Sequence, residues 1–297
     1  MKRVLEVALF LTLAWPAWTQ QQRPAITGIA FVRVFTGHDA ASADFYSKTL
    51  GFSSSKAGQL ARYPVNDSQW IEVTPLRSLE PGPRLAAVGF TTRDAKGMQR
   101  YLEAHGVHLF ESLHKGRFSV RDPEGNLIYF VQQTQGPAVA GEVPATATSR
   151  RIIHAGFIVK DVDLENEFYR DLLGFRPYWH GGRTEEKTDW MSFQVPDGSD
   201  WLEYMLNIPS LPTQRQYGVQ DHFSLGVEHM SDAVAALARN HCEGADCAKT
   251  QLGRDGKVQL NLYDPDLTRV EFMEFQPAGK PCCSEFTAKH PTEHEDR

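Results

Sequence analysis

An internal repeat is the strongest constraint on how this chain folds. The run Phe45–Phe52 (FYSKTLGF) matches the run Phe168–Phe175 (FYRDLLGF), and an Asp-Pro pair follows each run, at Asp122 and at Asp264. The matching runs lie 123 residues apart and the Asp-Pro pairs lie 142 apart, so the second copy carries about 19 additional residues. Self-similarity at such a spacing indicates a duplicated domain.

The repeat divides the chain into two copies, a linker and a tail. Residues 136–149 contain two Pro, two Gly and no apolar side chain bulkier than Val, which is typical of a linker. We therefore expect domains at 24–135 and 150–277, followed by a Cys-containing tail at 278–297. A length of 297 residues, of which 41% are hydrophobic, suits two domains with substantial cores.

Each copy is built from two similar modules. In the second copy, a strand-like run at 152–159 precedes a helix at 163–173, in which Leu164, Phe168 and Leu172 share one face. A second strand-like run at 222–227 precedes a helix at 232–240, and two or three further strands follow each helix. Because the first copy has the same order, we predict an α+β fold of two tandem domains.

Four residues with metal-ligand chemistry recur at equal spacing in the second copy. His154 and His222 begin the opening strands of its modules, and Glu203 and Glu271 lie in the closing strands, each 49 residues after its histidine. Modules related by a pseudo-twofold axis would bring these positions together inside a curved sheet. The donor set suits one divalent ion such as Zn, Ni, Co, Mn or Fe. Four protein ligands around an octahedral ion would leave two positions open for catalysis.

A purely structural role for these residues is the alternative. A histidine at a strand start is often only half buried, and a glutamate in an edge strand often faces water. Glu203 and Glu271, however, lie within apolar runs. An unpaired carboxylate there would be costly to bury, so we expect a metal site.

The second copy resembles the vicinal oxygen chelate superfamily, which includes glyoxalase I, bleomycin-resistance proteins and extradiol ring-cleaving dioxygenases. The resemblance rests on His154–Val159, on Phe168-Tyr169 and on Leu173-Gly174-Phe175, and it extends over nearly all of residues 24–277. It implies that each domain consists of paired βαβββ modules forming a curved, cup-like mixed sheet. It also implies four metal ligands: His154, Glu203, His222 and Glu271.

The resemblance implies a divalent-metal-dependent enzyme that binds a small substrate through vicinal oxygens. With Glu203 as a fourth ligand, a chelating substrate fills the remaining positions, which favours Lewis-acid-assisted proton transfer as in a glyoxalase-like lyase, isomerase or epimerase. Glu203 and Glu271 would be the catalytic carboxylates. The alternatives are an extradiol-type dioxygenase, with His154, His222 and Glu271 as an iron triad, and a non-enzymatic ligand-binding or resistance protein. No acid–base histidine of the extradiol type is evident.

The first copy departs from this pattern. Aligned on the shared phrases, it retains only Glu72, opposite Glu203. The positions of the other three ligands hold residues outside the ligand set: Gly28-Ile29-Ala30, Leu85 and Tyr129. One carboxylate cannot hold a metal, so we expect this domain to act as a scaffold.

Two long loops of the second copy, at 176–190 and 207–221, are candidates for the walls of a substrate pocket. They and the neighbouring strands hold five candidate lining residues: Arg183, Trp190, Tyr204, Arg215 and Tyr217. Surface or packing roles for these side chains are equally compatible with the sequence.

The N-terminus predicts export. Lys2 and Arg3 precede an apolar run from Val7 to Trp18, and a polar stretch follows. This order is typical of a secretory signal peptide, which we assign to residues 1–19. The mature chain would then be periplasmic or secreted.

The four cysteines fit an exported protein that contains disulfides. Cys242, Cys247, Cys282 and Cys283 allow three pairings, and a thiolate metal site or free thiols are the alternatives. A bridge between vicinal cysteines is strained. We therefore expect Cys282 and Cys283 to link the tail to Cys242 and Cys247.

Charge and hydropathy restrict the partners. The chain has 31 Lys and Arg against 37 Asp and Glu, a formal net charge of −6, which argues against binding a nucleic-acid backbone. The chain has no apolar run of the roughly 20 residues that a membrane-spanning helix needs. We expect a small-molecule substrate. A homodimer is compatible with the resemblance, because the family also builds sites between modules of different subunits.

Overall fold

A computed structural model describes residues 22–294 except 77, 79, 135 and 139–141. The predicted signal peptide, residues 1–19, lies outside the described residues. Among those described, no helix is both long enough and apolar enough to cross a membrane.

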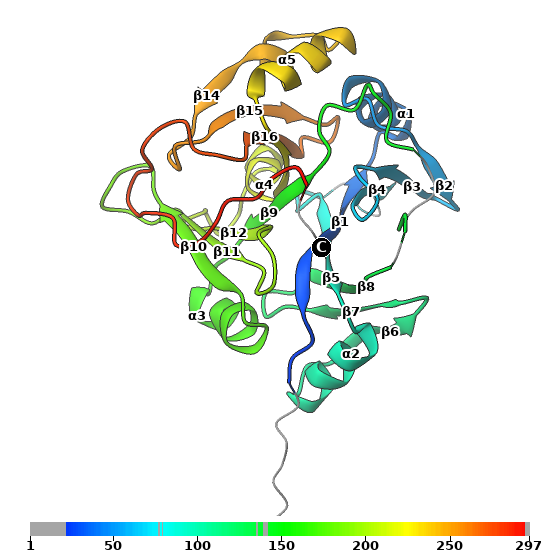
Figure 1. The fold of residues 1–297 in the computed structure, drawn as a ribbon, viewed down its shortest axis with the longest axis vertical. Coiled ribbons are helices and arrows are strands. Elements are labelled where there is room, and N and C mark those ends of the chain that lie inside the picture. The colour runs from blue at the N-terminus through cyan, green and yellow to red at the C-terminus, as the bar shows by residue number, and fades with distance from the viewer. Residues whose placement is uncertain (1–21, 77, 79, 135, 139–141, 295–297) are drawn as a thin grey trace, which may run out of the picture.

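Each copy of the repeat forms one eight-stranded mixed sheet (Figure 1). The strand order is β2-β3-β4-β1-β5-β8-β7-β6 in the first sheet and β10-β11-β12-β9-β13-β16-β15-β14 in the second. The strands of the first sheet are β1 (Ile26–Thr36), β2 (Ser55–Ala57), β3 (Leu60–Pro64), β4 (Trp70–Pro75), β5 (Leu85–Thr92), β6 (Leu109–His114), β7 (Arg117–Arg121) and β8 (Leu127–Gln132). Those of the second are β9 (Ile152–Ile158), β10 (Arg176–Gly181), β11 (Trp190–Gln194), β12 (Trp201–Met205), β13 (His222–Val227), β14 (Thr250–Leu252), β15 (Val258–Tyr263) and β16 (Arg269–Glu274).

Helices follow the opening strand of every module, so the order within each module is βαβββ. The helical segments are α1 (Asp39–Asp44), α2 (Ala95–Ala104), α3 (Val162–Asn166), α4 (Gln214–Gln220) and α5 (Met230–Arg239), two π-helical turns, η1 (Phe45–Thr49) and η2 (Glu167–Leu172), and a short 3₁₀ turn, η3 (Ala245–Ala248). In each sheet the two opening strands pair antiparallel at the centre, and each pairs in parallel with the closing strand of its own module. The predicted α+β fold of paired modules is confirmed.

The π-helical turns change which side chains face the core. In η2, the Leu173 N–H donates to the Phe168 carbonyl five residues earlier, and both side chains are buried. Leu164, expected on one helix face with Phe168 and Leu172, is 47% exposed, whereas Phe168 is buried, so the three do not share one environment. The wider turn shifts the buried face by one residue, from the expected Leu172 to Leu173.

The two loops expected at 176–190 and 207–221 contain regular structure. The first holds β10, which pairs antiparallel with β11, and the second holds α4. A capping box begins α4: Thr213 Oγ1 accepts from the Gln216 N–H, and the Gln216 side chain accepts from the Thr213 N–H. The sequence signal for this helix start, Thr followed three residues later by Gln, was overlooked.

The repeated aromatic and Asp-Pro segments form hydrogen bonds with each other across the two domains. Tyr46, from the first aromatic phrase, donates its hydroxyl hydrogen to Asp264 of the second domain at 3.0 Å. Tyr169, its counterpart, donates to Asp122 of the first domain, also at 3.0 Å. The pseudo-twofold axis relates these two hydrogen bonds. Each domain therefore contributes one tyrosine and one aspartate, which is why both sequence segments recur.

A second pair of reciprocal contacts fixes the opening strands. Asp200 of the second domain accepts from the Ile29 N–H in β1 at 2.8 Å, and Gln69 of the first accepts from the Ile152 N–H in β9 at 2.9 Å. Both side chains are fully buried. The apolar core runs through both domains, so the two sheets form one packed body.

The tail crosses the second sheet as a strap, residues 276–292 (Figure 1, orange to red). Its Thr287 N–H donates to the Tyr178 carbonyl in β10 at 3.0 Å, and Phe286 packs on the Tyr178 ring with centroids 4.9 Å apart. The Trp179 indole N–H donates to the Cys282 carbonyl at 3.2 Å. The strap therefore covers one end of the concave face of this sheet.

The expected disulfide pairing was wrong. The structure pairs Cys242 with Cys247 and Cys282 with Cys283. Cys242 and Cys247 lie in the loop that follows α5, whereas the strap holds its own cysteines beside Trp179 and Arg254. Because the strap runs along β10, its cysteines do not meet the α5 loop.

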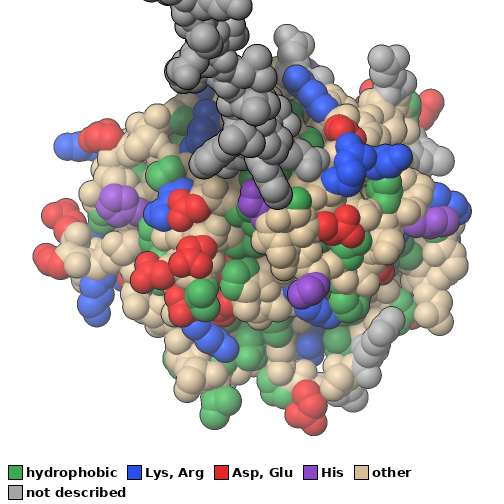
Figure 2. All heavy atoms as spheres, turned by 90° about the horizontal axis from the view of Figure 1, so that it is seen from below, with side chains coloured by type: hydrophobic (Ala, Val, Ile, Leu, Met, Phe, Trp, Pro, Cys, Tyr) green, Lys and Arg blue, Asp and Glu red, His purple; other side chains and the backbone are tan. Residues whose placement is uncertain are grey.

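The surface seen in Figure 2 carries charges of both signs. Outside its grey atoms, acidic and basic side chains are interspersed on this face. That face has no field of a single sign of the kind that steers a charged polymer.

A buried carboxyl group lies where the two domains meet. Glu165 of α3 is fully buried and accepts from the Glu124 N–H at 3.0 Å, while its second oxygen has no hydrogen-bond partner among the described residues. Burial, reinforced by the neighbouring Asp122 carboxylate, raises the Glu165 pKa to about 8. The folded chain therefore binds a proton that the unfolded chain releases above its ordinary pKa of about 4.3.

We predict that Glu165→Gln removes part of the pH dependence of stability. In the natural chain, the free energy of unfolding should fall as pH rises from about 4.3 toward the folded-state pKa near 8. The Gln variant keeps the acceptor oxygen and cannot ionise, so at pH 8 its Tm should be higher by about 2–4 °C or more. Thermal unfolding followed by circular dichroism at pH 5, 6.5 and 8 measures this. Glu167→Gln, an exposed change in the next helical turn, is the control. Parallel Tm curves for all three proteins would contradict the prediction.

Candidate metal centre

The four central strands of the second sheet each carry one predicted ligand. In the order β12-β9-β13-β16 these are Glu203, His154, His222 and Glu271. The pairing arranges them in two adjacent rows: Glu203 and His222 flank Gly156 of β9, and His154 and Glu271 flank Ser224 of β13. Both modules use the same strand register. Each glutamate therefore pairs with the residue two positions after the histidine of its own module.

Three of the four side chains converge on one point. His154 Nε2 lies 3.0 Å from His222 Nε2 and 3.1 Å from Glu271 Oε2, and His222 Nε2 lies 3.8 Å from the same oxygen. All three are buried and form a group able to hold a metal ion. Ligand atoms at right angles around an ion, with bonds of about 2.1 Å, are about 3.0 Å apart. The donor atoms therefore fit a divalent ion.

Glu203 borders this triad. Its Oε2 lies 3.6 Å from His222 Nε2, and its side chain is 13% exposed on the wall of a cavity. Ser192 Oγ lies 3.5 Å from its other oxygen. The predicted four residues thus form a compact triad with a fourth carboxylate beside it.

Burial prepares the two imidazoles to act as ligands. It lowers the pKa of both His154 and His222, so their rings are neutral. His222 Nδ1 lies 2.9 Å from the Gln220 carbonyl. This contact places the ring hydrogen on Nδ1 and leaves the Nε2 lone pair facing the triad.

The two carboxyl groups repel each other. Burial opposes ionisation of Glu271, but Arg269 and His154 outweigh it and lower the pKa of this group. Burial and the Glu271 charge raise the pKa of Glu203 to about 8. A divalent cation between the carboxylates would relieve this repulsion, which is a second reason why the residues fit a metal.

Gly156 provides the space for His222. A Cβ built at position 156 would lie 2.4 Å from His222 Cε1, closer than side chains approach each other. Any larger residue there would displace the ring. Sequence reasoning missed this requirement, although a glycine inside an apolar strand signals a close approach.

A cavity of about 260 Å³ opens beside the carboxylates. Twelve residues line it: Trp179, Trp190, Glu203, Gln251, Leu252, Gly253, Arg254, Asp255, Gln259, Arg269, Glu271 and Met273. Among the five candidates from the sequence, only Trp190 is on this wall. Tyr204 packs in the opposite core against Tyr169. Arg269 and Trp179 were missed, although strand alternation places Arg269 on the same face of β16 as Glu271.

The first sheet lacks the triad at the corresponding positions. The strand register places Phe31, Ala87 and Tyr129 where the second sheet has His154, His222 and Glu271. The alignment of Leu85 with His222 was wrong by two residues, since Ala87 pairs with Arg33 as His222 pairs with Gly156, and the His154 position is held by Phe31, just after the expected Gly28-Ile29-Ala30. Tyr129 and Glu72 stand where the sequence placed them.

An arginine occupies the first site. Arg33 stands at the position of Gly156, and its Nη2 lies 2.6 Å from Glu72, which is fully buried. The guanidinium carbon lies 4.9 Å from the Tyr129 ring centroid and 5.5 Å from that of Phe31. Arg62 and Arg117 lie 3.1 and 3.4 Å from the other Glu72 oxygen, so covalently attached cations neutralise the one carboxylate that this sheet keeps from the ligand set.

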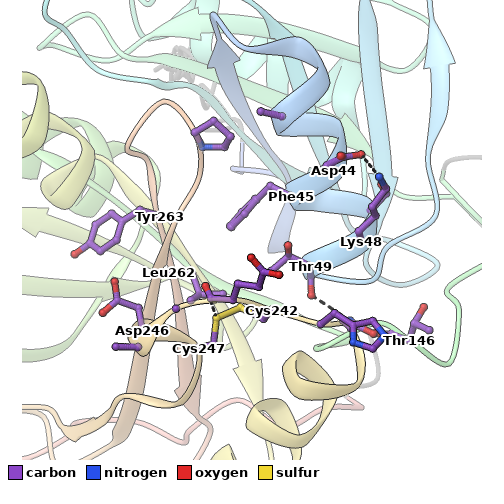
Figure 3. A pocket seen from close by; sticks show the side chains of 18 residues that line it. Asp44, Phe45, Lys48, Thr49, Thr146, Cys242, Asp246, Cys247, Leu262 and Tyr263 are labelled. Carbon is purple, nitrogen blue, oxygen red and sulfur yellow. Dashed lines mark hydrogen bonds and ion pairs between the residues drawn. A yellow bond between two sulfur atoms is a disulfide. The ribbon is translucent and has the colours of Figure 1, made fainter.

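A larger cavity, about 1020 Å³, lies between the domains and shares no residue with the triad. Figure 3 shows the Asp44–Lys48 ion pair and Phe45 on one side, and the Cys242–Cys247 disulfide and Tyr263 on the other. Its acidic and basic groups do not converge as the triad does. We therefore take the cavity beside Glu203 and Glu271 as the functional site.

Comparison with known families matches both domains. A family model described as the Glyoxalase/Bleomycin resistance protein/Dioxygenase superfamily matches residues 28–130 and 151–272. Comparison with curated proteins gives no match. The two matched segments coincide with the two sheets.

Solved structures with a similar fold include extradiol enzymes. A variant of homoprotocatechuate 2,3-dioxygenase from Brevibacterium fuscum, in complex with HPCA, has a TM-score of 0.63 at 19% identity, covering 85% of this chain and 72% of the other. An anaerobic complex of this dioxygenase with 3,4-dihydroxyphenylacetate has a TM-score of 0.63 at 17% identity, covering 85% and 82%. The enzyme from Arthrobacter globiformis has a TM-score of 0.62 at 16% identity, covering 85% and 80%. At these identities the likeness concerns the fold.

We predict that His222→Ala and Glu271→Ala each abolish binding of one divalent metal per chain. Each change removes one of the three converging donors, so affinity should fall by well over about tenfold. Elemental analysis of protein purified without chelator measures the content. Glu72→Gln in the first sheet is the matched control and should retain the metal. Stoichiometric metal in both ligand variants, or its loss in the control, would contradict the assignment.

Gly156→Ala should also weaken metal binding, although position 156 supplies no ligand. The added methyl group would push His222 away from His154, because the built Cβ lies 2.4 Å from the ring. We expect affinity to fall by about tenfold or more while the fold is retained, as judged by zinc titration and circular dichroism. Gly226→Ala, where a Cβ would meet Phe275 rather than a ligand, is the control. Unchanged zinc affinity in Gly156→Ala would show that the ring position is not critical.

Proposed function

Because the chain belongs to the glyoxalase/bleomycin resistance protein/dioxygenase superfamily, we propose that its second domain is a metal-dependent enzyme that cleaves catechol-type substrates with dioxygen. The observation that carries the proposal is the compact triad of His154, His222 and Glu271, with their donor atoms 3.0–3.8 Å apart. Two histidines and one carboxylate are the ligand set of non-haem iron(II) oxygenases, which keep several positions open. The fold neighbours named above are extradiol dioxygenases, which supports the same choice.

The chain's own residues would bind and orient the substrate. Trp179 and Trp190 provide aromatic walls, and a cavity of about 260 Å³ suits a single ring. Iron bound to the triad would supply the activation of dioxygen and of the vicinal hydroxyl groups. Burial keeps both histidines neutral, and Arg269 keeps Glu271 ionised.

With a divalent cation at the triad offsetting the Glu271 charge and keeping Glu203 ionised, Glu203 would accept a proton from a substrate hydroxyl group. Its carboxyl oxygen lies 3.6 Å from His222 and faces the cavity. The residues lining the cavity include no histidine, so the acid–base histidine expected of an extradiol enzyme has no counterpart on this wall. A carboxylate within reach of the substrate can perform the same transfer.

A second candidate function is glyoxalase-like proton transfer, which the sequence favoured. The position of Glu203 beside His222 supports it, since a small movement would make Glu203 a fourth ligand and leave two open positions. The two candidate functions give Glu203 different roles. In the glyoxalase-like reaction it is a metal ligand, whereas in the dioxygenase reaction it only transfers a proton.

We predict that the iron(II)-loaded protein consumes dioxygen and a catechol in equal amounts. Glu203→Gln should retain iron and lower kcat by about 10²–10⁴-fold, because it removes the proton acceptor and leaves the triad intact. An oxygen electrode, with elemental analysis of the same samples, measures both quantities. Glu185→Gln, an exposed change in the 182–189 loop, is the control.

The opposite result would support the second candidate. Loss of metal in Glu203→Gln, no oxygen uptake with any catechol, and solvent deuterium incorporation into 2-hydroxy ketones or 2-oxo aldehydes with nickel, cobalt, manganese or zinc would overturn the dioxygenase proposal.

A further inference from the structure

One charged side chain at the metal centre makes no hydrogen bond with the described residues of the chain. Arg269 lies two residues before Glu271 on the same face of β16 and lines the cavity, with only 13% of its side chain exposed. Its Nη1 is 3.6 Å from Glu271 Oε1, which is longer than a hydrogen bond. Its Nε is buried and has no partner among the described residues.

This arrangement is costly unless a ligand completes it. A guanidinium group carries five N–H donors, and a buried charged donor without an acceptor costs more than a neutral one. Glu271 does not satisfy the Arg269 guanidinium. Its Oε1 is 3.6 Å away, and its Oε2 lies 3.1 Å from His154 Nε2. Asn261, which pairs with Glu271 across the β15–β16 ladder, also has a buried oxygen without a partner. Two polar side chains next to Glu271, Arg269 on the cavity wall and Asn261 on the neighbouring strand, thus have buried atoms without a partner among the described residues.

We propose that Arg269 binds a carboxylate of the substrate, attached directly beside the two oxygens that chelate the metal. This inference rests on the proposed function and specifies its substrate class: small, anionic vicinal diols such as catechols with an adjacent carboxylate. The planar fork of arginine matches a carboxylate with two parallel hydrogen bonds.

The position of Arg269 determines where the anionic group must lie. The guanidinium is only 3.6 Å from the carboxylate that belongs to the triad. A substrate group bound to it therefore lies next to the metal-binding oxygens and not at the far end of the molecule. A ring with its carboxylate on the opposite side would direct that group away from Arg269.

A second guanidinium strengthens the preference for an anion. Arg254 lines the same cavity from the turn after β14, and it is held by the Gly182 carbonyl at 3.0 Å and by Cys282 Sγ at 2.7 Å. Its donors are therefore partly used, whereas those of Arg269 are not. We assign Arg269 as the group that contacts the carboxylate directly.

Equilibrium binding to the zinc-loaded full chain tests the inference without turnover. Trp179 and Trp190 line the cavity, so quenching of tryptophan fluorescence reports occupancy. The probes are 2,3-dihydroxybenzoate, its isomer 3,4-dihydroxybenzoate, and catechol. We expect 2,3-dihydroxybenzoate to bind most tightly, and Arg269→Met to raise its Kd by about tenfold or more, a typical loss for a charged contact. The Kd values of the other two should change less than about threefold.

Variants and controls keep the result interpretable. Arg269→Lys keeps the charge without the fork and should recover part of the affinity, while Arg239→Met, on the exposed side of α5, should bind like the natural chain. Equal weakening of all three probes, or loss of zinc in Arg269→Met, would show that Arg269 only supports Glu271 and would overturn the inference. So would unchanged binding of 2,3-dihydroxybenzoate. Failure of the proposed function appears separately, as absent oxygen uptake by the iron-loaded chain.

Discussion

The antiparallel pairing of β9 with β13 is the constraint on which the rest of the site depends. It sets His222 opposite Gly156 and His154 opposite Ser224, so the two Nε2 atoms approach to 3.0 Å. The parallel pairs on either side then deliver one carboxylate each from β12 and β16. No loop is needed to assemble the four groups, because the module symmetry does so. The reciprocal Tyr–Asp bonds between the domains hold this sheet against its neighbour.

The two sheets show two ways to balance charge at the same place. In the first, Arg33 replaces the glycine, and its guanidinium neutralises Glu72 from within the chain. In the second, Gly156 leaves that space to the His222 ring, and the carboxyl groups lie close to each other beside neutral histidines. An internal cation makes a permanent structural unit, whereas an exchangeable one leaves positions for substrate. The two copies thus carry different groups at the same place, a built-in cation in the first sheet and a group able to hold a metal ion in the second.

Much of this arrangement could be predicted from the sequence. The equal spacing of His154 to Glu203 and of His222 to Glu271 was sufficient, because strand register repeats exactly as the modules repeat. The errors arose where local geometry breaks the period. The position expected for Leu85 is held by Ala87, because the two copies differ in the length of chain before this strand, and a π-helical turn follows the exposed Leu164. The disulfide pairing depended on the path of the strap, which residue spacing does not encode. Arg269 could be recognised only once its unpaired donors were visible.

The account requires one divalent ion between His154, His222 and Glu271, and none in the first sheet. Anomalous diffraction from crystals of the iron- or zinc-loaded full chain, recorded above and below the metal absorption edge, tests this most directly. We predict a single strong peak within bonding distance of His154 Nε2, His222 Nε2 and Glu271 Oε2, about 2.0–2.2 Å. The map should show no peak between Arg33 and Glu72. A peak in the first sheet, or the absence of one at the triad in metal-loaded crystals, would contradict the account.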